Sequence, residues 1–181
     1  MVKDKVLDDG SIVWRLVLDN RVVNDNLVKL QFPQSLTMEE IWQSAAGCKY
    51  IATLDAPKAF YGIQVAASSR YLSSFIHPIK QQRYWFTRLV MGNTNSPAIQ
   101  QQFFLQTLQT YACWIDDVVI ACTDPNDFFT RLDNLLSIAM RFNFKFNLRK
   151  CKFLFDPSVI LGRYVGSMGM RPLPKHVLNV E

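Results

Sequence analysis

Two adjacent carboxylates, Asp116 and Asp117, stand in the middle of an apolar run, residues 111–121. The run is rich in Val, Ile, Tyr and Trp and contains no Gly or Pro, which favours a strand. Neighbouring side chains of a strand point to opposite faces, so both carboxyls reach one space only at a tight hairpin tip. Uncompensated burial of carboxylates costs several kcal/mol, and their hard oxygens suit Mg²⁺ or Mn²⁺. The pair therefore predicts a divalent-cation site, with a solvated surface turn as the alternative.

A third carboxylate, Asp55, comes at the end of another apolar segment, residues 50–54. Pro57 follows two positions later and must interrupt the hydrogen-bond ladder of a strand. We therefore expect Asp55 at a strand end, which is a suitable place for a metal ligand. An Asp that simply starts a turn is the alternative.

The composition indicates a folded globular protein. The chain has 181 residues, of which 49% are hydrophobic and 19% charged, and this excludes a disordered chain. Its formal net charge of +5 permits a polyanionic partner without requiring one. We expect no membrane span, because no apolar run approaches about 20 residues, and no signal peptide at the N-terminus.

The cysteines and histidines do not suggest a metal site. The four cysteines have no metal-type spacing, and we expect them to be reduced, buried and structural. They are Cys48, Cys113, Cys122 and Cys151. The two histidines are too few and too isolated for a zinc site or an imidazole-activated nucleophile.

The first third of the chain predicts a hairpin and a helix. Residues 5–24 are expected to form the hairpin, because Asp-Gly lies in a turn at residues 7–11 between two β-rich segments. Thr37 and Glu40 have the spacing of a capping box, which opens a short helix. Gly47 is expected to end that helix.

The remaining segments alternate between strands and helices. Residues 71–79 and 83–90 are β-rich, and a helix follows with Ser96 as its N-cap and Pro97 as its first residue. One side of this helix is expected to be apolar and the other to carry several Gln. The apolar side consists of Ile99, Phe103, Phe104 and Leu108.

The last third predicts a helix and two strands. Asp124 caps the helix, and its apolar stripe is interpreted as core. The stripe consists of Phe129, Leu132, Leu135, Leu136, Ala139 and Met140. Strands are expected around residues 145–148 and 153–166. The pattern is that of an α+β fold in which helices cover one face of an antiparallel sheet.

Six segments, in the same order and at similar spacing, resemble motifs of reverse transcriptases from gypsy-type LTR retrotransposons and retrovirus-like elements. Residues 14–24 are similar to the fingers segment, and residues 54–60 to the first palm motif. The other four are residues 92–98 (GNTNSPA), 114–117 (WIDD), 146–151 (FNLRKC) and 160–162 (ILG). The resemblance covers nearly the whole chain. It departs from the family at Val90, Asn93 and Trp114, and in a shorter interval between the first two aspartates.

The resemblance implies a fold, namely the fingers and palm of a right-hand polymerase with thumb and RNase H absent. Residues 1–50 and 71–93 would form the fingers. Residues 51–70 and 94–171 would form the palm with its primer grip, and residues 172–181 the start of a linker toward a thumb.

The resemblance also implies an activity, that of an RNA-directed DNA polymerase. Asp55, Asp116 and Asp117 would be catalytic. With the backbone carbonyl of Ala56, they would hold two Mg²⁺ (or Mn²⁺) ions that transfer dNTPs to a primer 3′-hydroxyl.

Further residues are assigned by the same resemblance. It implies that Arg15, Phe60, Asn95, Ser96 and Lys150 bind the nucleotide. It also implies that Leu161, Gly162 and Arg163 form the primer grip. Four of these five nucleotide-binding assignments have a plainer alternative: core packing for the aromatic residue, solvation for the arginine, helix capping for the serine, and cover of a sheet edge for the lysine.

The expected partners are an RNA or DNA template with its primer, a dNTP, and either the remaining domains of a polyprotein or a dimer partner. The expected location is the cytoplasm or a virus-like particle, with the nucleus as a further option. Two other functions stay open. One is a domesticated, non-catalytic module that binds nucleic acid or protein. The other is an RNA-dependent RNA polymerase, which would normally have a small or polar residue in place of Phe60.

Overall fold

The computed structural model describes residues 2–6, 9–15, 18–33, 35–56 and 59–174. The chain divides into two compact units, both discontinuous in sequence. The first unit comprises residues 1–31 and 60–98, and the second residues 32–59 and 99–181. These boundaries differ in position from the expected limits of fingers and palm, and the assignment of those names to the units stays a prediction.

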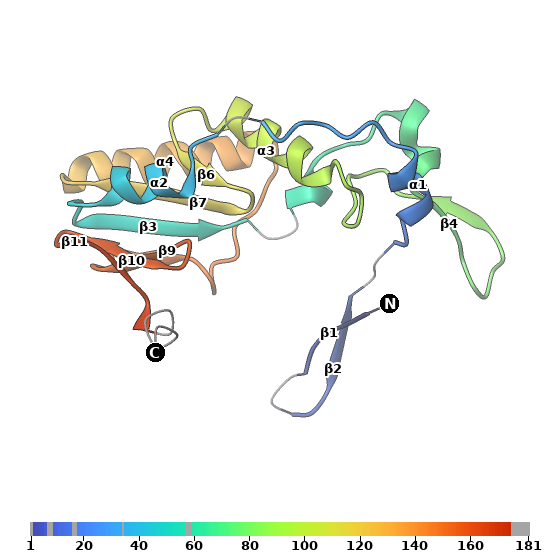
Figure 1. Ribbon diagram of the computed structural model, residues 1–181, viewed down its shortest axis with the longest axis horizontal. Coiled ribbons are helices and arrows are strands. Elements are labelled where there is room, and N and C mark those ends of the chain that lie inside the picture. The colour runs from blue at the N-terminus through green and yellow to red at the C-terminus, as the bar shows by residue number, and fades with distance from the viewer. Residues whose placement is uncertain (1, 7–8, 16–17, 34, 57–58, 175–181) are drawn as a thin grey trace. The chain divides into compact units, whose positions relative to one another are not determined.

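The second unit is built on a four-stranded antiparallel sheet (Figure 1). Its strands, in spatial order, are β6 (Ala112–Trp114), β7 (Asp117–Cys122), β3 (Tyr50–Asp55) and β8 (Lys152–Phe153). Both central strands, β3 and β7, are largely buried, which explains why they read as continuous apolar runs in the sequence. The expected combination of helices with antiparallel sheet is confirmed.

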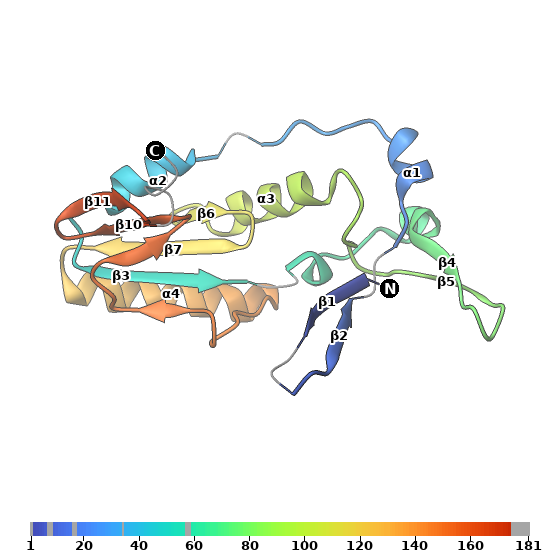
Figure 2. The ribbon, with the colours of Figure 1, turned by 60° about the horizontal axis from the view of Figure 1, so that its bottom comes forward.

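Both faces of this sheet are covered. Helices α3 (Ser96–Thr107) and α4 (Pro125–Phe142) lie on one face (Figures 1 and 2). Ala52, Leu54, Val118 and Ile120 point toward this face and share a hydrophobic cluster with the two helices. We expected helices on one face only. The structure adds a helix and a second sheet on the other face, because β3 and β7 alternate buried residues to both sides.

The opposite face carries α2 (Met38–Ala45) and a small antiparallel sheet. The sheet consists of β9 (Ser158–Ile160), β10 (Arg163–Gly166) and β11 (Gly169–Pro172). A second hydrophobic cluster fills this layer, with Ile41, Ile51, Val119, Ile160 and Val165 at its centre.

The local helix signals at the starts of α2 and α4 are confirmed. Thr37 Oγ1 accepts a hydrogen bond from Glu40 N, and the Glu40 carboxylate accepts one from Thr37 N, which completes the capping box of α2. The Asp124 carboxylate caps α4 by accepting from the backbone N–H groups of Asn126 and Asp127.

The predicted apolar stripe of α4 was wrong in part. Leu135 and Ala139 are buried, but Phe129 is 56% exposed and Met140 83% exposed. Phe128 lies in the core instead, so the buried face is turned by about one residue relative to the prediction.

Other strand predictions needed correction near the C-terminus. The segment around 145–148 has no strand, because residues 148–150 form a turn. The expected strand at 153–166 is divided among β8, β9 and β10. Pro172 ends β11, and residues 175–181 lie outside the described part of the chain, so the expected linker over 172–181 stays a prediction.

The first unit has two hairpins and short helices. Strands β1 (Val2–Val6) and β2 (Ile12–Arg15) pair, but the expected hairpin over 5–24 is shorter because α1 (Arg21–Asp25) occupies its end. The 3₁₀ helices η1 (Ala59–Gly62) and η2 (Ala67–Ser73) precede a hairpin of β4 (Ser74–Ile76) and β5 (Arg83–Trp85). The β-rich segments 71–79 and 83–90 therefore contain only short strands.

The four cysteines are free thiols; three are buried and Cys151 is half-buried, as expected. Within the described residues, no helix is long and apolar enough to cross a membrane.

Candidate active site

Strand pairing brings three carboxylates to one end of the central sheet. Asp55 is the last residue of β3 and lies directly opposite Asp117, the first residue of β7. Asp116 comes just before Asp117 in the turn that joins β6 to β7. The six paired positions from Tyr50 to Asp55 fix this register, so the fold itself places the carboxylates together.

The turn that carries the two adjacent aspartates has an unfavourable backbone conformation. Ile115 has a φ of +55°, in the left-handed region, which a β-branched residue rarely adopts. Such a conformation costs on the order of 1–3 kcal/mol and persists only where neighbouring groups impose it.

Two glutamines of α3 supply those neighbouring groups. Gln101 Oε1 accepts a hydrogen bond from Ile115 N at 2.8 Å, and Gln100 Nε2 donates to Ile115 O at 2.6 Å. Gln101 Nε2 also donates to the Cys113 carbonyl at 3.2 Å. Both glutamines are fully buried. They tie the turn to the helix at both polar groups of Ile115.

The sequence predicts these glutamines on the polar side of the helix, and the structure shows this to be wrong for Gln100 and Gln101. Their spacing contained the missing signal: Gln100, Phe104 and Leu108 recur every four residues and therefore share the buried face. The sequence pattern indicates that Phe104 and Leu108 are buried, but it does not indicate that the side-chain amides of Gln100 and Gln101 lie on the same face.

The carboxylates line one pocket of the second unit. Asp55 is buried, Asp117 is half-buried and Asp116 is exposed. The pocket walls also include residues of β3, β7, β8 and β9, of the segment before β8 and of the turn after β9. The full lining is Thr53, Asp55, Asp116, Asp117, Val119, Lys150, Lys152, Val159, Ile160 and Leu161.

Lys150 is the cation closest to the buried carboxylate. Its Nζ lies 3.1 Å from Asp55 Oδ1 and 3.2 Å from Oδ2, and the geometry of a hydrogen bond is met only at Oδ2. The Asp55 side chain is 11% exposed, whereas that of Lys150 is 62% exposed. A backbone bond from Asn147 N to Asp55 O, at 2.8 Å, anchors the turn that carries Lys150.

The electrostatics of the site disfavour a third negative charge. Burial, together with the charges of Asp116 and Asp55, raises the pKa of Asp117 to about 6, against the opposing effect of Lys150. The three carboxylates outnumber Lys150 and Lys152, the two lysines that line the same pocket.

The donor set fits a hard divalent cation. Three carboxylates face one pocket, and Asp55 Oδ1 is buried without a hydrogen bond. With Lys150 paired to Asp55, however, no three His, Cys, Asp or Glu side chains of the described residues converge closely enough to hold an ion as they stand. The Ala56 N–H donates to Asp116 O at 2.7 Å, and the expected role of its carbonyl stays a prediction.

The expected primer-grip residues form the β9–β10 turn. Leu161 (φ +43°) and Gly162 (φ +83°) make a two-residue connection between the paired residues Ile160 and Arg163. Leu161 also lines the carboxylate pocket. The Arg163 guanidinium lies over the ring of Trp42, 4.2 Å from its centroid.

The remaining expected nucleotide-binding residues belong to the first unit. Asn95 is buried, with Oδ1 accepting from Leu30 N and Nδ2 donating to Val28 O. Ser96 Oγ donates to the Val90 carbonyl at 2.7 Å, and α3 begins at Ser96 itself, so Ser96 is not the N-cap that the sequence predicts. The structure thus gives both a local structural role, and their binding role stays a prediction.

The other two, Arg15 and Phe60, are described less fully. Arg15 ends β2, and its side chain lies outside the described part of the structure. Phe60 is half-buried in η1. Both binding roles stay predictions.

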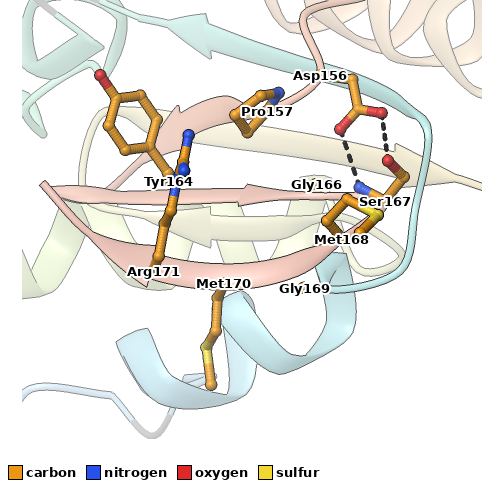
Figure 3. Close-up of a pocket in the computed structure, with 9 residues that line it drawn as sticks. All are labelled: Asp156, Pro157, Tyr164, Gly166, Ser167, Met168, Gly169, Met170 and Arg171. Carbon is orange, nitrogen blue, oxygen red and sulfur yellow. Dashed lines mark hydrogen bonds between the residues drawn. The ribbon is translucent and has the colours of Figure 1, made fainter.

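A second pocket, on the β10–β11 hairpin, has a structural explanation (Figure 3). The Asp156 carboxylate accepts hydrogen bonds from Ser167 N and Oγ, which lowers the pKa of Asp156. A Cβ on Gly166 would collide with Asp156 and lie 2.9 Å from Pro157 Cα, so the strand needs glycine there. These contacts fasten the hairpin to the segment before β9.

The chain is similar in sequence to proteins of a known family. The family described as reverse transcriptase (RNA-dependent DNA polymerase) matches residues 6–170. The retrovirus-related Pol polyprotein from transposon 297 of Drosophila melanogaster is 28% identical over 170 residues, covering 91% of this chain and 16% of the relative. The Pro-Pol polyprotein of simian foamy virus type 1 is 31% identical over 145 residues, covering 78% of this chain and 12% of the relative.

The fold also matches solved structures. A foamy viral protease-reverse transcriptase in complex with double-stranded DNA has a TM-score of 0.81 at 21% identity, over 99% of this chain and 34% of that one. The chain therefore spans a small part of its polyprotein relatives and about a third of this structure.

Proposed function

Because the chain belongs to the reverse transcriptase (RNA-dependent DNA polymerase) family, we propose that it is the nucleotidyl-transfer core of an RNA-directed DNA polymerase. The observation that carries the proposal is the register of β3 and β7, which sets Asp55 opposite Asp117 and beside Asp116. The proposed reaction joins a dNTP to the 3′-hydroxyl of a primer on an RNA or DNA template.

The three carboxylates are the proposed holders of two Mg²⁺ or Mn²⁺ ions, together with the Ala56 carbonyl. Bound ions would supply activation of the primer hydroxyl and stabilisation of the leaving pyrophosphate. The elevated pKa of Asp117 supports this role, because a bound cation offsets the repulsion that raises it.

Lys150 is proposed to exchange partners during binding. Its ammonium neutralises Asp55 in the chain as described, and its largely exposed side chain is free to turn toward a triphosphate. Arg15 is proposed as a further triphosphate contact, since a guanidinium suits phosphate geometry. Phe60 is proposed to exclude a 2′-hydroxyl and so to favour dNTPs over rNTPs.

The proposed nucleic-acid partner follows from the relatives. Foamy viral protease-reverse transcriptases have been solved with double-stranded DNA and with an RNA/DNA hybrid. We propose that this chain also binds template–primer, within a longer polyprotein. The expected cellular location stays a prediction.

Primer extension tests the proposal directly. The chain is incubated with a primed RNA template, dNTPs and Mg²⁺ or Mn²⁺, beside Asp116→Ala and the control Asp133→Ala, an exposed carboxylate of α4. Extension by the wild type and the control, but not by Asp116→Ala, is the expected result. Template–primer binding without any extension would contradict catalysis by this chain and favour a non-catalytic binding module. Use of rNTPs in place of dNTPs would favour an RNA polymerase.

A further inference from the structure

The turn between β9 and β10 holds a leucine in a conformation that leucine avoids. Leu161 has a φ of +43° and is followed by Gly162 at +83°. Glycine adopts a positive φ at little cost, whereas for other L-residues the left-handed conformation is unfavourable. Because Leu161 also lines the carboxylate pocket, the contacts that hold this turn fix part of the pocket wall as well.

Trp42 of α2 contacts both residues that flank the turn. Its indole Nε1 donates a hydrogen bond of 2.9 Å to the Ile160 carbonyl, across 118 positions of the sequence. The Arg163 guanidinium lies 4.2 Å from the centroid of the Trp42 ring. Ile160 and Arg163 are paired residues, with only the two turn residues between them. One side chain therefore holds the turn at both of its ends.

The helix that carries Trp42 is itself firmly placed. Its N-terminus is closed by the capping box of Thr37 and Glu40. Ile41 and Ala45 are fully buried in the second hydrophobic cluster, and Trp42 packs half-buried beside them. The helix and the turn both belong to the second unit.

The other end of β10 has an anchor of its own. Gly47 N, just after α2, donates to Gly166 O at 2.9 Å. Ser167 donates to the Asp156 carboxylate at the adjoining turn. Neither contact involves Trp42, so the two ends of the strand can be disturbed separately.

Packing of an apolar helix face does not by itself explain a tryptophan at position 42. Leucine or phenylalanine would also fill the edge of the cluster, but neither can donate a hydrogen bond to the Ile160 carbonyl. The flat guanidinium of Arg163 over the ring is a cation–π contact, for which indole is the best partner. Both polar contacts are directed at the turn.

We propose that Trp42 is a positioning residue of the candidate site, which holds the β9–β10 turn and thereby places Leu161 in the wall of the carboxylate pocket. Trp42 acts through the turn, because it does not itself line that pocket. The inference deepens the proposed function and rests on it, since a reaction at the carboxylates is what a displaced wall would slow.

Hydrogen exchange measured by mass spectrometry, without metal or dNTP, tests the contact. Trp42→Phe keeps a ring beneath Arg163 but removes the donor. Exchange in residues 160–164 should therefore become about fivefold to tenfold faster, as expected for the loss of one hydrogen bond. Trp42→Leu also removes the aromatic face and should add about a further twofold to fivefold. Exchange in residues 166–170, at the other anchor, should stay unchanged.

Single-turnover primer extension separates positioning from folding. The rate constant of Trp42→Phe should fall about tenfold, because small displacements near reacting groups are costly, while the KM for dNTP and the reaction amplitude stay within about twofold. Partial unfolding would instead lower the amplitude, because fewer molecules would be competent. Gln43→Leu, at the next and exposed position of α2, is the matched control and should behave as the wild type in both measurements.

Wild-type exchange at the turn in both Trp42 variants would overturn the proposal. Faster exchange that extends equally to residues 166–170 would also overturn it, because it would indicate general destabilisation. Faster exchange at the turn with an unchanged rate constant would limit Trp42 to local stability and overturn it as well. If the wild type does not extend a primer, the proposed function fails, whereas the exchange rates still decide whether Trp42 holds the turn.

Discussion

At the scale of single residues, the candidate site is defined by an imbalance of charge. Three carboxylates share one pocket with Lys150, whose ammonium pairs with Asp55. Asp117 sits half-buried between the other two carboxylates, so its ionisation is costly, and its pKa rises to about 6. Such a site stores electrostatic repulsion that a cation would relieve.

The raised pKa of Asp117 makes the stability of the folded chain depend on pH. The folded-state pKa of Asp117, about 6, exceeds the value of about 4 expected for the unfolded chain. The folded state therefore holds the proton more tightly. The stability that this provides is complete below pH 4 and is lost as the pH rises through 6. Asp117→Asn, which stays neutral, should match the wild type near pH 4.

At pH 7.5, without metal, Asp117→Asn should be more stable than the wild type by about 1 kcal/mol, allowing for solvent screening of a partly exposed carboxyl. Urea unfolding at both pH values measures this. Asp133→Asn, at an exposed position of α4, should change little at either pH. An equal gain for Asp117→Asn at pH 4 and 7.5 would disprove the charge explanation.

At the scale of elements, the β6–β7 turn depends on the helix beside it. Ile115 adopts a left-handed conformation and exposes its N–H and C=O to Gln101 and Gln100 of α3. The aspartates follow directly in the chain. Their position is therefore set by two side chains that do not line the pocket themselves.

Gln101→Leu tests this dependence. It leaves Ile115 N and Cys113 O without partners in a buried site, so unfolding should require about 1–3 kcal/mol less free energy. If the chain polymerises, kcat should fall on the order of tenfold to a hundredfold, because small displacements of catalytic groups are costly. Gln102→Leu, at the next and exposed position, should leave both quantities nearly unchanged. A loss of stability with kcat intact would limit the role of Gln101 to folding.

Gly166→Ala tests how the β10–β11 hairpin is fastened. The new methyl group would collide with the Asp156 carboxylate and Pro157, so the hairpin must shift. A destabilisation of about 1–3 kcal/mol is expected for forced overpacking. At Gly62, by contrast, a Cβ meets nothing within 4 Å and φ is not positive, so Gly62→Ala should be almost neutral. Equal melting temperatures for the two variants would contradict this account.

Local signals in the sequence predicted the elements best. The capping box at Thr37 and the cap at Asp124 depend on side chains within three residues of each other, and both were confirmed. The α4 stripe failed because Phe128 and Phe129 are adjacent and either can lead an apolar face. Only packing against the sheet decides between them, and periodicity does not contain that information.

The site was predictable in part. Apolar runs ending at Asp55 and surrounding Asp116 indicated strands, and the structure pairs those strands. The roles of Gln100 and Gln101 were not predicted, because their partners are backbone groups of a turn more than ten residues away. The Lys150–Asp55 contact spans 95 positions, and no local pattern specifies it.

At the scale of the whole molecule, all three carboxylates and the elements that hold them belong to the second unit. That unit contains the central sheet and both hydrophobic clusters. A ligand at the carboxylates is therefore expected to stabilise this unit directly.

Thermal unfolding with Mn²⁺ measures the effect. At a concentration tenfold above its Kd, the ion should add about 1.4 kcal/mol of stability, which corresponds to a rise in Tm of about 2–6 °C. Asp116→Ala should lose most of this rise, and Asp133→Ala should retain it. An equal rise in all three proteins would place the ion elsewhere.

The pairing of β3 with β7 also restricts how such a chain can change its length. The ladder has six consecutive pairs, which run from Tyr50 with Cys122 at one end to Asp55 with Asp117 at the other. Inserting or deleting one residue in either strand would exchange its two faces and move an aspartate out of the pocket. Insertions and deletions among descendants of this sequence should therefore fall in the connecting turns, and a functional descendant with a gap inside either strand would contradict the expectation.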